Sequence, residues 1–379
     1  MGSVTMHNSS IHQQDQIDEV IREAVKGSGK VNIVVAGKTG VGKSTLINCV
    51  FRGELARTGS GKPVTQEIEE ISKDGHPITI IDSKGLELKD YQKISDDLKE
   101  FIRERSINHD ENKHIHAAWL CIQEGGERIE DAEIELCNML RSLSIPVVVV
   151  ITKSRFKKDC NFVAEIKKLL PSASAVIRVR AQADTLEDDE GNTITFRIRG
   201  IDELITETGR LIPEAKKRAF ANALSSRHQS SMRLKVEQAE KEVMIASGLA
   251  AAAGATPIPF SDTFVLVPIQ VGMLAKIGIT FGMELSTSAL TTLVTSALGS
   301  SAASLLGRAV VTGVLKMIPG LGSIAGGTIA ATTAATLTKT LGAAYITVLT
   351  DFCNNNPGKE LNLALIGNEL KKRMNFSDN

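Results

Sequence analysis

Eight consecutive residues that could hold a phosphate lie between an apolar run and a predicted helix. The segment fits the pattern G-x-x-x-x-G-K-[ST] and reads Gly37-Lys38-Thr39-Gly40-Val41-Gly42-Lys43-Ser44. Its glycines allow backbone N–H groups to turn toward an anion, and Lys43 adds a full positive charge. Residues 31–36 predict a buried parallel strand, and the residues from Thr45 to 51 predict a helix whose N-terminus faces the anion. The pattern therefore predicts a nucleotide phosphate site with Ser44 on a Mg²⁺ ion.

Two segments further along the chain supply residue types that a Mg²⁺-bound triphosphate needs. Asp82-Ser83-Lys84-Gly85 has the form D-x-x-G and follows the apolar run 78–81. We expect Asp82 to contact Mg²⁺ through a water molecule and the Gly85 N–H to meet the γ-phosphate. Thr65, in a predicted loop over 59–65, is placed to complete the Mg²⁺ coordination. Ser44, Thr65 and Asp82 are therefore the candidate metal ligands, and Lys43, Thr65 and Gly85 are the candidate catalytic residues.

In this order and spacing, the three motifs resemble those of Era-like and septin-like P-loop GTPases. The resemblance implies that Thr65 and Gly85 belong to two switch loops, which the γ-phosphate orders and hydrolysis releases. It also implies slow intrinsic hydrolysis, because Leu86 stands where Ras-like enzymes hold a water-orienting Gln. Similar GTPases take the missing group from elsewhere, often through dimerisation. Lys38 is either a catalytic cation or a solvated lysine.

The base-specificity motif of this family is incomplete in the chain. After the apolar run 146–151, Thr152 and Lys153 match the first two positions of [NT]-K-x-D, but Arg155 replaces the Asp. In the family, that Asp accepts two hydrogen bonds from guanine, and Lys153 would stack over the base. Asp159, four residues after Arg155, is a candidate substitute for this acceptor. The resemblance implies GTP and GDP as ligands, with an ATP-binding P-loop protein as an alternative.

Strands and helices alternate in the predicted G domain, residues 30–212, which indicates an α/β doubly wound sheet. The hairpin signal at Asp74-Gly75 adds one antiparallel edge strand to a mostly parallel sheet. A second hairpin is predicted over 184–199, around an acidic turn. A disordered tail and an amphipathic helix precede the domain, over 1–29. The predicted strands are 31–36, 67–72, 76–82, 117–122, 146–151 and 175–180, and the predicted helices are 43–51, 127–143, 160–170 and 201–212.

The composition changes after Pro213, so we predict a separate all-α domain over 213–379. A charged helix is predicted over 214–242, and residues 243–350 carry only six charged side chains among 108 residues. Ala, Gly, Ser and Thr dominate there. The segments around Pro257, Pro268 and Pro319 resemble the YcjF-type domain of unknown function that follows some Era-like GTPases.

Two charge-free stretches in this half, 285–307 and 317–338, are long enough to cross the ~30 Å hydrocarbon core of a bilayer. Their small residues also suit tightly packed helices. A compact helical domain, true spans and reversible membrane contact through 243–350 are therefore all open. The chain has 44 basic and 44 acidic residues, so no net charge favours nucleic acid.

The five cysteines form no C-x-x-C pair, which favours a reducing, cytoplasmic compartment, with membrane association left open. His114 and His116 have the spacing of a metal pair, but we expect them to be structural.

The sequence as a whole predicts a Mg²⁺-dependent, GTP-binding and GTP-hydrolysing switch. Its helical domain would bind a membrane, a partner or another copy, and the G domain is a candidate homodimer interface. The alternative is a nucleotide-gated assembly module with negligible turnover.

Overall fold

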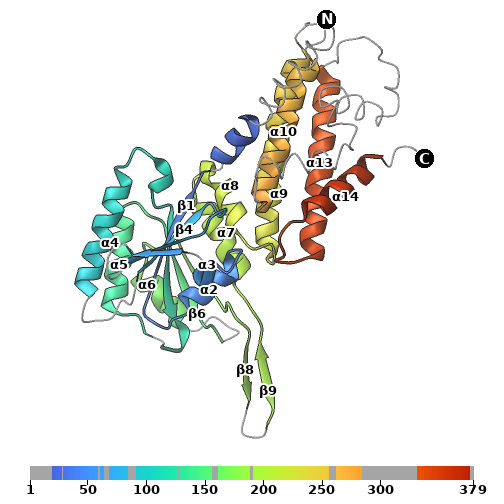
Figure 1. The fold of residues 1–379 in the computed structure, drawn as a ribbon. Coiled ribbons are helices and arrows are strands. Elements are labelled where there is room, and N and C mark those ends of the chain that lie inside the picture. The colour runs from blue at the N-terminus through green and yellow to red at the C-terminus, as the bar shows by residue number, and fades with distance from the viewer. Residues whose placement is uncertain are drawn as a thin grey trace, which may run out of the picture. The chain divides into compact units, whose positions relative to one another are not determined.

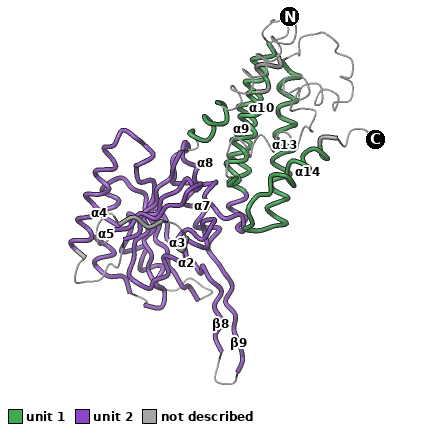
Figure 2. The backbone as a smooth tube through the Cα atoms, in the orientation of Figure 1, with its two compact units in different colours: residues 1–28, 233–379 green, residues 29–232 purple. Residues whose placement is uncertain are grey.

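The computed structural model of the chain describes residues 19–27, 29–58, 60–63, 68–83, 91–126, 128–155, 161–187, 191–255, 262–283 and 331–375. The chain divides into two compact units (Figure 2). The unit of residues 29–232, purple and labelled unit 2 in Figure 2, is called the first unit below. The second unit combines residues 1–28 with residues 233–379 and is green there.

A mostly parallel sheet lies at the centre of the first unit (Figure 1). Its four parallel pairings join β4, β1, β5, β6 and β7, and β3 runs antiparallel to both β2 and β4. The predicted fold class is confirmed, but the antiparallel strand β3 is second from the edge of the sheet, and β2 forms the edge. The segment 59–65, predicted as a loop, contains β2, whose backbone groups are paired with β3. In order across the sheet, the strands are β2 (Ser60–Pro63), β3 (Ile68–Ser72), β4 (Ile78–Ser83), β1 (Val31–Ala36), β5 (Ala117–Gln123), β6 (Val147–Thr152) and β7 (Ala175–Arg178).

Helices cover both faces of this sheet, which explains why its central strands are almost continuously apolar. On one face, α4 (Tyr91–Ser106), α5 (Asp131–Ser142) and α6 (Asn161–Leu169) share a hydrophobic core with the sheet. On the other face lie α2 (Lys43–Val50), α7 (Ile201–Leu211) and α8 (Glu214–Ala223) (Figure 1). There the buried Trp119 stacks on Phe51 and donates its indole N–H to Thr208 Oγ1 at 3.0 Å. The shorter helices are α3 (Leu55–Thr58), η1 (Glu111–Lys113) and η2 (Glu124–Gly126).

The predicted charged helix over 214–242 is in fact two helices. α8 ends at Ala223, and α9 (Gln229–Gly254) starts after a break. The residues after the C-terminus of α2 contact the chain at this break: the Arg52 N–H donates to Ala223 O at 2.9 Å, and Leu224 forms a bridge with Phe51. These tertiary hydrogen bonds replace the helical ones. Because α8 belongs to the first unit, the division at 232 and 233 falls later than the predicted boundary at 213.

The predicted hairpin over 184–199 is confirmed. β8 (Asp184–Glu187) and β9 (Thr193–Phe196) pair antiparallel, with Asp184 opposite Phe196. The hairpin extends beyond the main sheet (Figure 1). It is inserted between β7 and α7, so its base lies at the edge of the sheet where the parallel strands end.

The second unit is helical. Its labelled helices are α9, most of which lies in this unit, α10 (Asp262–Phe281), α13 (Ala331–Asn355) and α14 (Leu363–Asn375). α9 and α13 approach closely at Gly342, where a Cβ atom would meet Val243 Cγ2 at 2.5 Å. Residues 19–26 are helical, and their buried Ile21 and Ala24 show an amphipathic helix with one face packed. This helix lies against α10, because a Cβ atom at Gly272 would meet Val20 Cγ1 at 3.0 Å.

The two charge-free stretches lie largely outside the described residues. Residues 285–307 lie wholly outside them, and so does the first part of 317–338, up to residue 330. Among the helices that the structure describes, none has the length and apolarity that crossing a bilayer would require.

His116 should make the stability of the first unit depend on pH. Its ring is buried, and its Nδ1 accepts the Asn32 N–H at 3.0 Å. Burial, and secondly the charge of Lys216, lower the pKa of this imidazole to about 4. An unfolded histidine titrates near 6.5, so between about pH 6.5 and 4 the unfolded state binds more protons. The free energy of unfolding should therefore fall as the pH drops through this window, by roughly 2–3 kcal/mol for this group.

Urea unfolding at pH 7.0 and pH 4.5 measures this effect. His116→Asn keeps an acceptor for the Asn32 N–H but does not titrate, so it should lose that part of the pH dependence. His114→Asn is the matched control, because His114 lies two residues away and its Nε2 contacts Asn108 O at 2.8 Å. An identical pH dependence in wild type and His116→Asn would contradict the assignment.

Candidate nucleotide site

The phosphate-loop segment 37–44 lies between β1 and α2, in the predicted order of strand, loop and helix. Its backbone needs glycine at Gly37, where φ is +148° and a Cβ atom would overlap the carbonyl oxygen of Cys121 on β5. Gly40 and Gly42 are left-handed, with φ of +77° and +101°, and Gly42 is the N-cap of α2. These conformations turn the chain sharply before the helix begins. The loop therefore places the N-terminus of α2 beside the carboxyl end of β1.

Lys43 closes this loop with its side chain. Its ammonium donates to Gly37 O at 2.8 Å and to Lys38 O at 3.3 Å. It also lies 3.9 Å from Asp82 Oδ1 at the end of β4, and only 10% of the side chain is exposed. The structure thus brings the lysine of the first motif and the aspartate of the second together, from segments 39 positions apart.

Lys38 is only partly solvated, with 34% of its side chain exposed. Its ammonium forms an ion pair with Glu130, the N-cap residue of α5. Glu130 and Glu133 form a capping box, in which the Glu130 N–H donates to Glu133 Oε2 at 2.9 Å. Burial raises the pKa of Glu133. The ion pair ties the second residue of the phosphate loop to the start of α5, which the sequence did not predict.

The side chain of Thr152, at the end of β6, is hydrogen-bonded to the phosphate loop. Its buried hydroxyl donates to Val41 O at 2.7 Å and lies 3.3 Å from Ile122 O. The next residue, Lys153, has a left-handed backbone with φ of +52°, and its ammonium donates to Gln123 Oε1 at 3.2 Å. Thr152 therefore links the end of β6 to the loop, a role that the family motif alone did not indicate.

A cavity of about 340 Å³ lies beside the phosphate loop. Three segments line it: 41–46 from the loop and α2, 152–155 after β6, and 179–184 after β7. Cavities that hold small ligands start at about this size. The predicted base-specificity segment and the chain that follows β7 therefore meet at one pocket, next to the candidate phosphate site.

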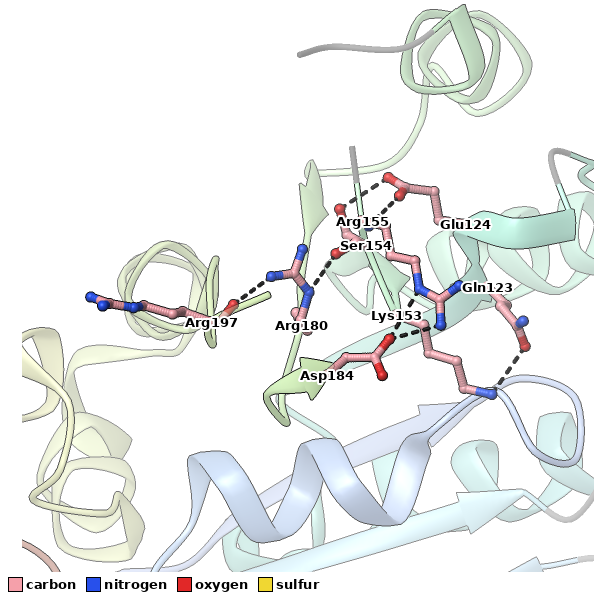
Figure 3. A network of polar contacts seen from close by, with 8 residues as sticks. All are labelled: Gln123, Glu124, Lys153, Ser154, Arg155, Arg180, Asp184 and Arg197. Atoms are coloured by element: carbon pink, nitrogen blue, oxygen red, sulfur yellow. Dashed lines mark hydrogen bonds and ion pairs between the residues drawn. The ribbon is translucent and has the colours of Figure 1, made fainter. Parts of the chain in front are cut away.

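A buried acidic residue organises the wall of this pocket. Glu124, which is 1% exposed, accepts from the Ser154 hydroxyl at 3.0 Å and from the Arg155 N–H at 2.6 Å (Figure 3). Its carboxylate also pairs with the guanidinium of Arg178 at 2.6 Å. These donors offset part of the cost of burying the carboxylate away from water. The network fixes the backbone of the segment 152–155.

The Arg155 side chain turns to Asp184 at the start of β8. Its Nε and Nη2 donate to Asp184 Oδ2 at 3.0 and 2.7 Å, and both residues line the pocket (Figure 3). Arg180 donates to Ser154 O at 2.8 Å and to Arg197 O at 2.6 Å, so it joins the pocket wall to the hairpin. Neither Glu124 nor the pairing of Asp184 with Arg155 was predicted from the sequence. The one signal for Glu124 was its place directly after the apolar strand β5.

Several predicted site residues lie outside the described residues: Thr65, Gly85, Leu86 and the substitute acceptor Asp159. Of the predicted Mg²⁺ ligands, Ser44 is exposed in the first turn of α2, and Asp82 faces the Lys43 ammonium. A hydroxyl and a carboxylate oxygen are the ligand types that Mg²⁺ accepts, and it usually keeps phosphate and water oxygens as well. These two residues therefore fit a Mg²⁺ ion bound together with a triphosphate.

Comparison with known families matches both halves of the chain. Residues 32–153 match the family described as 50S ribosome-binding GTPase, and residues 215–374 match a domain of unknown function, DUF697. The chain contains a GTPase domain followed by a DUF697 domain. Both predicted resemblances are confirmed, and the matched GTPase domain belongs to the P-loop class. The GTPase match includes the phosphate loop and ends at Lys153.

Curated relatives share the first half. The tRNA modification GTPase MnmE of Prochlorococcus marinus is 29% identical over 192 residues, which cover 48% of this chain and 38% of MnmE. Human Septin-9 is 25% identical over 210 residues, 48% of this chain and 36% of the septin. The chain thus spans less than two fifths of these relatives. A solved structure of a probable GTP-binding protein, engB, is 22% identical, with 48% of this chain and 98% of engB covered and a TM-score of 0.31.

Gly37→Ala should disrupt the phosphate loop. The added methyl would overlap a backbone oxygen of the central strand β5, which cannot move without breaking the sheet. We expect a loss of stability of roughly 1–3 kcal/mol and a large loss of nucleotide affinity. Thermal unfolding and titration with a fluorescent nucleotide measure the two effects.

Gly40→Ala is the matched control for this prediction. Gly40 also has a positive φ, but among the described residues nothing lies within 4 Å of the position that the added methyl would take. It should therefore show the backbone strain without the overlap. Equal losses in the two variants would contradict the role of the Cys121 contact.

Proposed function

We propose that the protein is a Mg²⁺-dependent switch that binds and hydrolyses GTP. The observation that carries the proposal is the position of the Lys43 ammonium, which donates to two carbonyl oxygens of the phosphate loop and lies beside Asp82. Such an ammonium can exchange carbonyl oxygens for phosphate oxygens without leaving its place. A pocket of nucleobase size lies next to the same loop. The match to a GTPase domain supports the same function.

Each described residue has a separate part in this mechanism. The N–H groups at the start of α2 and the Lys43 charge would hold the β- and γ-phosphates. Ser44 and Asp82 would hold Mg²⁺, which neutralises phosphate charge when bound. The Thr152 hydroxyl donates to the carbonyl of Val41 and so keeps that oxygen turned away from the anion. The residues that would respond to the γ-phosphate, Thr65 and Gly85, are assigned from the sequence.

The DUF697 domain would carry the output of the switch, by binding a membrane, a partner or another copy of the chain. α9 supports a binding role, because Met244 is 71% exposed and Ile245 and Leu249 are each 54% exposed. Large apolar side chains gathered on the exposed face of one helix are typical of an interaction surface.

Ser44→Asn tests the metal assignment and the function together. The asparagine removes the hydroxyl ligand, and the triphosphate depends on Mg²⁺ more than the diphosphate does. We expect GTP affinity to fall roughly tenfold more than GDP affinity, and GTP turnover to be lost. Binding and phosphate release are measured with GTP and with ATP, in Mg²⁺ and in EDTA.

A residue on the next turn of the same helix provides the control. Asn48 lies four residues after Ser44 on α2, and its Oδ1 accepts the Ala56 N–H at 2.7 Å. The control variant is Asn48→Ser. It should leave the ratio of GTP to GDP affinity unchanged. The proposed function fails if the wild type shows no Mg²⁺-dependent GTP binding. The metal role of Ser44 alone fails if Ser44→Asn weakens GTP and GDP equally.

A further inference from the structure

The geometry points to Asp184 as the residue that reads the guanine base, in place of the aspartate that the segment 152–155 lacks. The assignment rests on the proposed function, because it concerns the same nucleotide. It also explains how an arginine is accommodated at position 155.

Asp184 lines the pocket that would hold the base. It lines the same pocket as Gly42 and Thr45 of the phosphate-loop side and Lys153 of the predicted base-specificity segment. It is the first residue of β8, and the chain immediately before it, from Val179, forms one wall of the pocket. The carboxylate is 40% exposed, so a ligand in the pocket can reach it.

Arg155 orients this carboxylate without using all of it. Both guanidinium contacts, at 3.0 and 2.7 Å, go to Oδ2 (Figure 3). Among the described residues, no hydrogen bond to Oδ1 is seen. A carboxylate can accept about four hydrogen bonds, so two acceptor sites remain for a ligand. Arg155 is itself held by its backbone N–H, which donates to the buried Glu124 at 2.6 Å.

The hairpin fixes Asp184 from the opposite direction. Asp184 is paired in register with Phe196 on β9, and the Arg180 guanidinium lies 4.9 Å from the centre of the Phe196 ring. Arg180 in turn donates to Ser154 O, in the segment that carries Arg155. The carboxylate is thus held in place before a ligand arrives, which lowers the entropy cost of binding.

The chemistry of an acceptor-only group favours guanine. Guanine presents two adjacent donors, N1–H and the N2 amino group, which a carboxylate oxygen can accept. Adenine presents the N1 lone pair at the corresponding place, and xanthine presents the O2 carbonyl oxygen instead of the amino group. Either would set a lone pair against Asp184. A site whose polar group is left unpaired rejects such analogues strongly.

Asp184→Asn tests the assignment by reversing part of this pattern. The amide still accepts a hydrogen bond from Arg155 and from N1–H, but its NH₂ group now donates, so it suits the O2 of xanthine. Calorimetric titrations with the diphosphates of guanosine, xanthosine, inosine and adenosine would be run on the full chain. The wild type should prefer the guanosine diphosphate. The variant should lose roughly 10- to 100-fold in guanosine diphosphate affinity and gain in xanthosine diphosphate affinity.

Glu187→Gln is the matched control. It neutralises an exposed acid on the same strand, three residues away, which does not line the pocket. Its ligand preference should equal that of the wild type. The gain in xanthosine diphosphate affinity is a signal that a misfolded protein would not give.

The failures of the two proposals are distinguishable. If the wild type binds guanosine diphosphate no better than the adenosine form, the proposed function is wrong. If the wild type prefers guanosine diphosphate and Asp184→Asn keeps the same ratio of guanosine to xanthosine affinity, only the assignment of Asp184 is wrong.

Discussion

Lys43→Ala is expected to lower the affinity for GTP and GDP by roughly 10²–10⁴-fold. The Lys43 ammonium lies inside the phosphate loop, where it bonds Gly37 O and Lys38 O, and 10% of the side chain is exposed. Each hydrogen bond from a charged group to a phosphate contributes about 1.5–3 kcal/mol, and the alanine removes two of them. A titration with a fluorescent GTP analogue measures the loss.

The fold should survive this substitution, because Lys43 is at the first residue of α2 and its present bonds are to loop carbonyls. Lys73→Ala controls for the loss of a lysine elsewhere in the same unit: its ammonium donates to Gly53 O at 3.2 Å, in the turn after α2. The control should bind nucleotide like the wild type. A Lys43→Ala variant that unfolds at the wild-type temperature and retains wild-type affinity would contradict the phosphate-loop assignment.

The phosphate loop was predictable from the sequence because all its parts are contiguous. A strand, a glycine-rich turn and a helix start lie within residues 31–51, and each has a local signal. Gly37 is the clearest case: its place in the motif predicted an unusual backbone, and the structure shows the overlap with Cys121 that makes glycine necessary. Local patterns of this kind depend little on tertiary context.

The pocket wall could not be predicted in the same way, because its residues are brought together only by the fold. Glu124 pairs with Arg178 across 54 positions, Arg155 with Asp184 across 29, and Thr152 with Val41 across 111. No local pattern couples such positions in a single sequence. The base-specificity motif is incomplete in the sequence, and the substitute acceptor expected along the chain, Asp159, lies outside the described residues. The pairing of Arg155 with Asp184 across the pocket has no local sequence signal.

Helix α4 was not predicted, although the sequence contains the periodic apolar pattern of an amphipathic helix there. No helix was predicted between residues 82 and 117, yet Ile94, Leu98, Phe101 and Ile102 recur at helical spacing and are buried against the sheet. Many charged residues surround them, as expected for the exposed face of an amphipathic helix. The broken helix after residue 223 is the opposite case, because a tertiary contact with Phe51 overrode a continuous helical pattern.

GTP turnover per molecule is expected to rise with protein concentration. The residue after the D-x-x-G glycine is Leu86, which has no polar group to orient a water molecule. Such a group has to come from elsewhere, and a second G domain is a candidate source. Groups supplied in this way raise turnover by roughly 10³–10⁵-fold in related enzymes, so even weak self-association should be visible.

Phosphate release at saturating GTP and Mg²⁺, from sub-micromolar to tens of micromolar protein, measures this dependence. Lys43→Ala, measured over the same range, gives the background from contaminating hydrolases, since a contaminant would also scale with the amount of protein added. Adding Lys43→Ala to dilute wild type then separates two sources of the missing group. An increase in turnover would show that a second copy need not hold nucleotide itself, whereas no increase would require both copies to be loaded. A specific rate that stays flat over the whole range for the wild type would remove self-activation and favour a separate activating protein or a binding-only module.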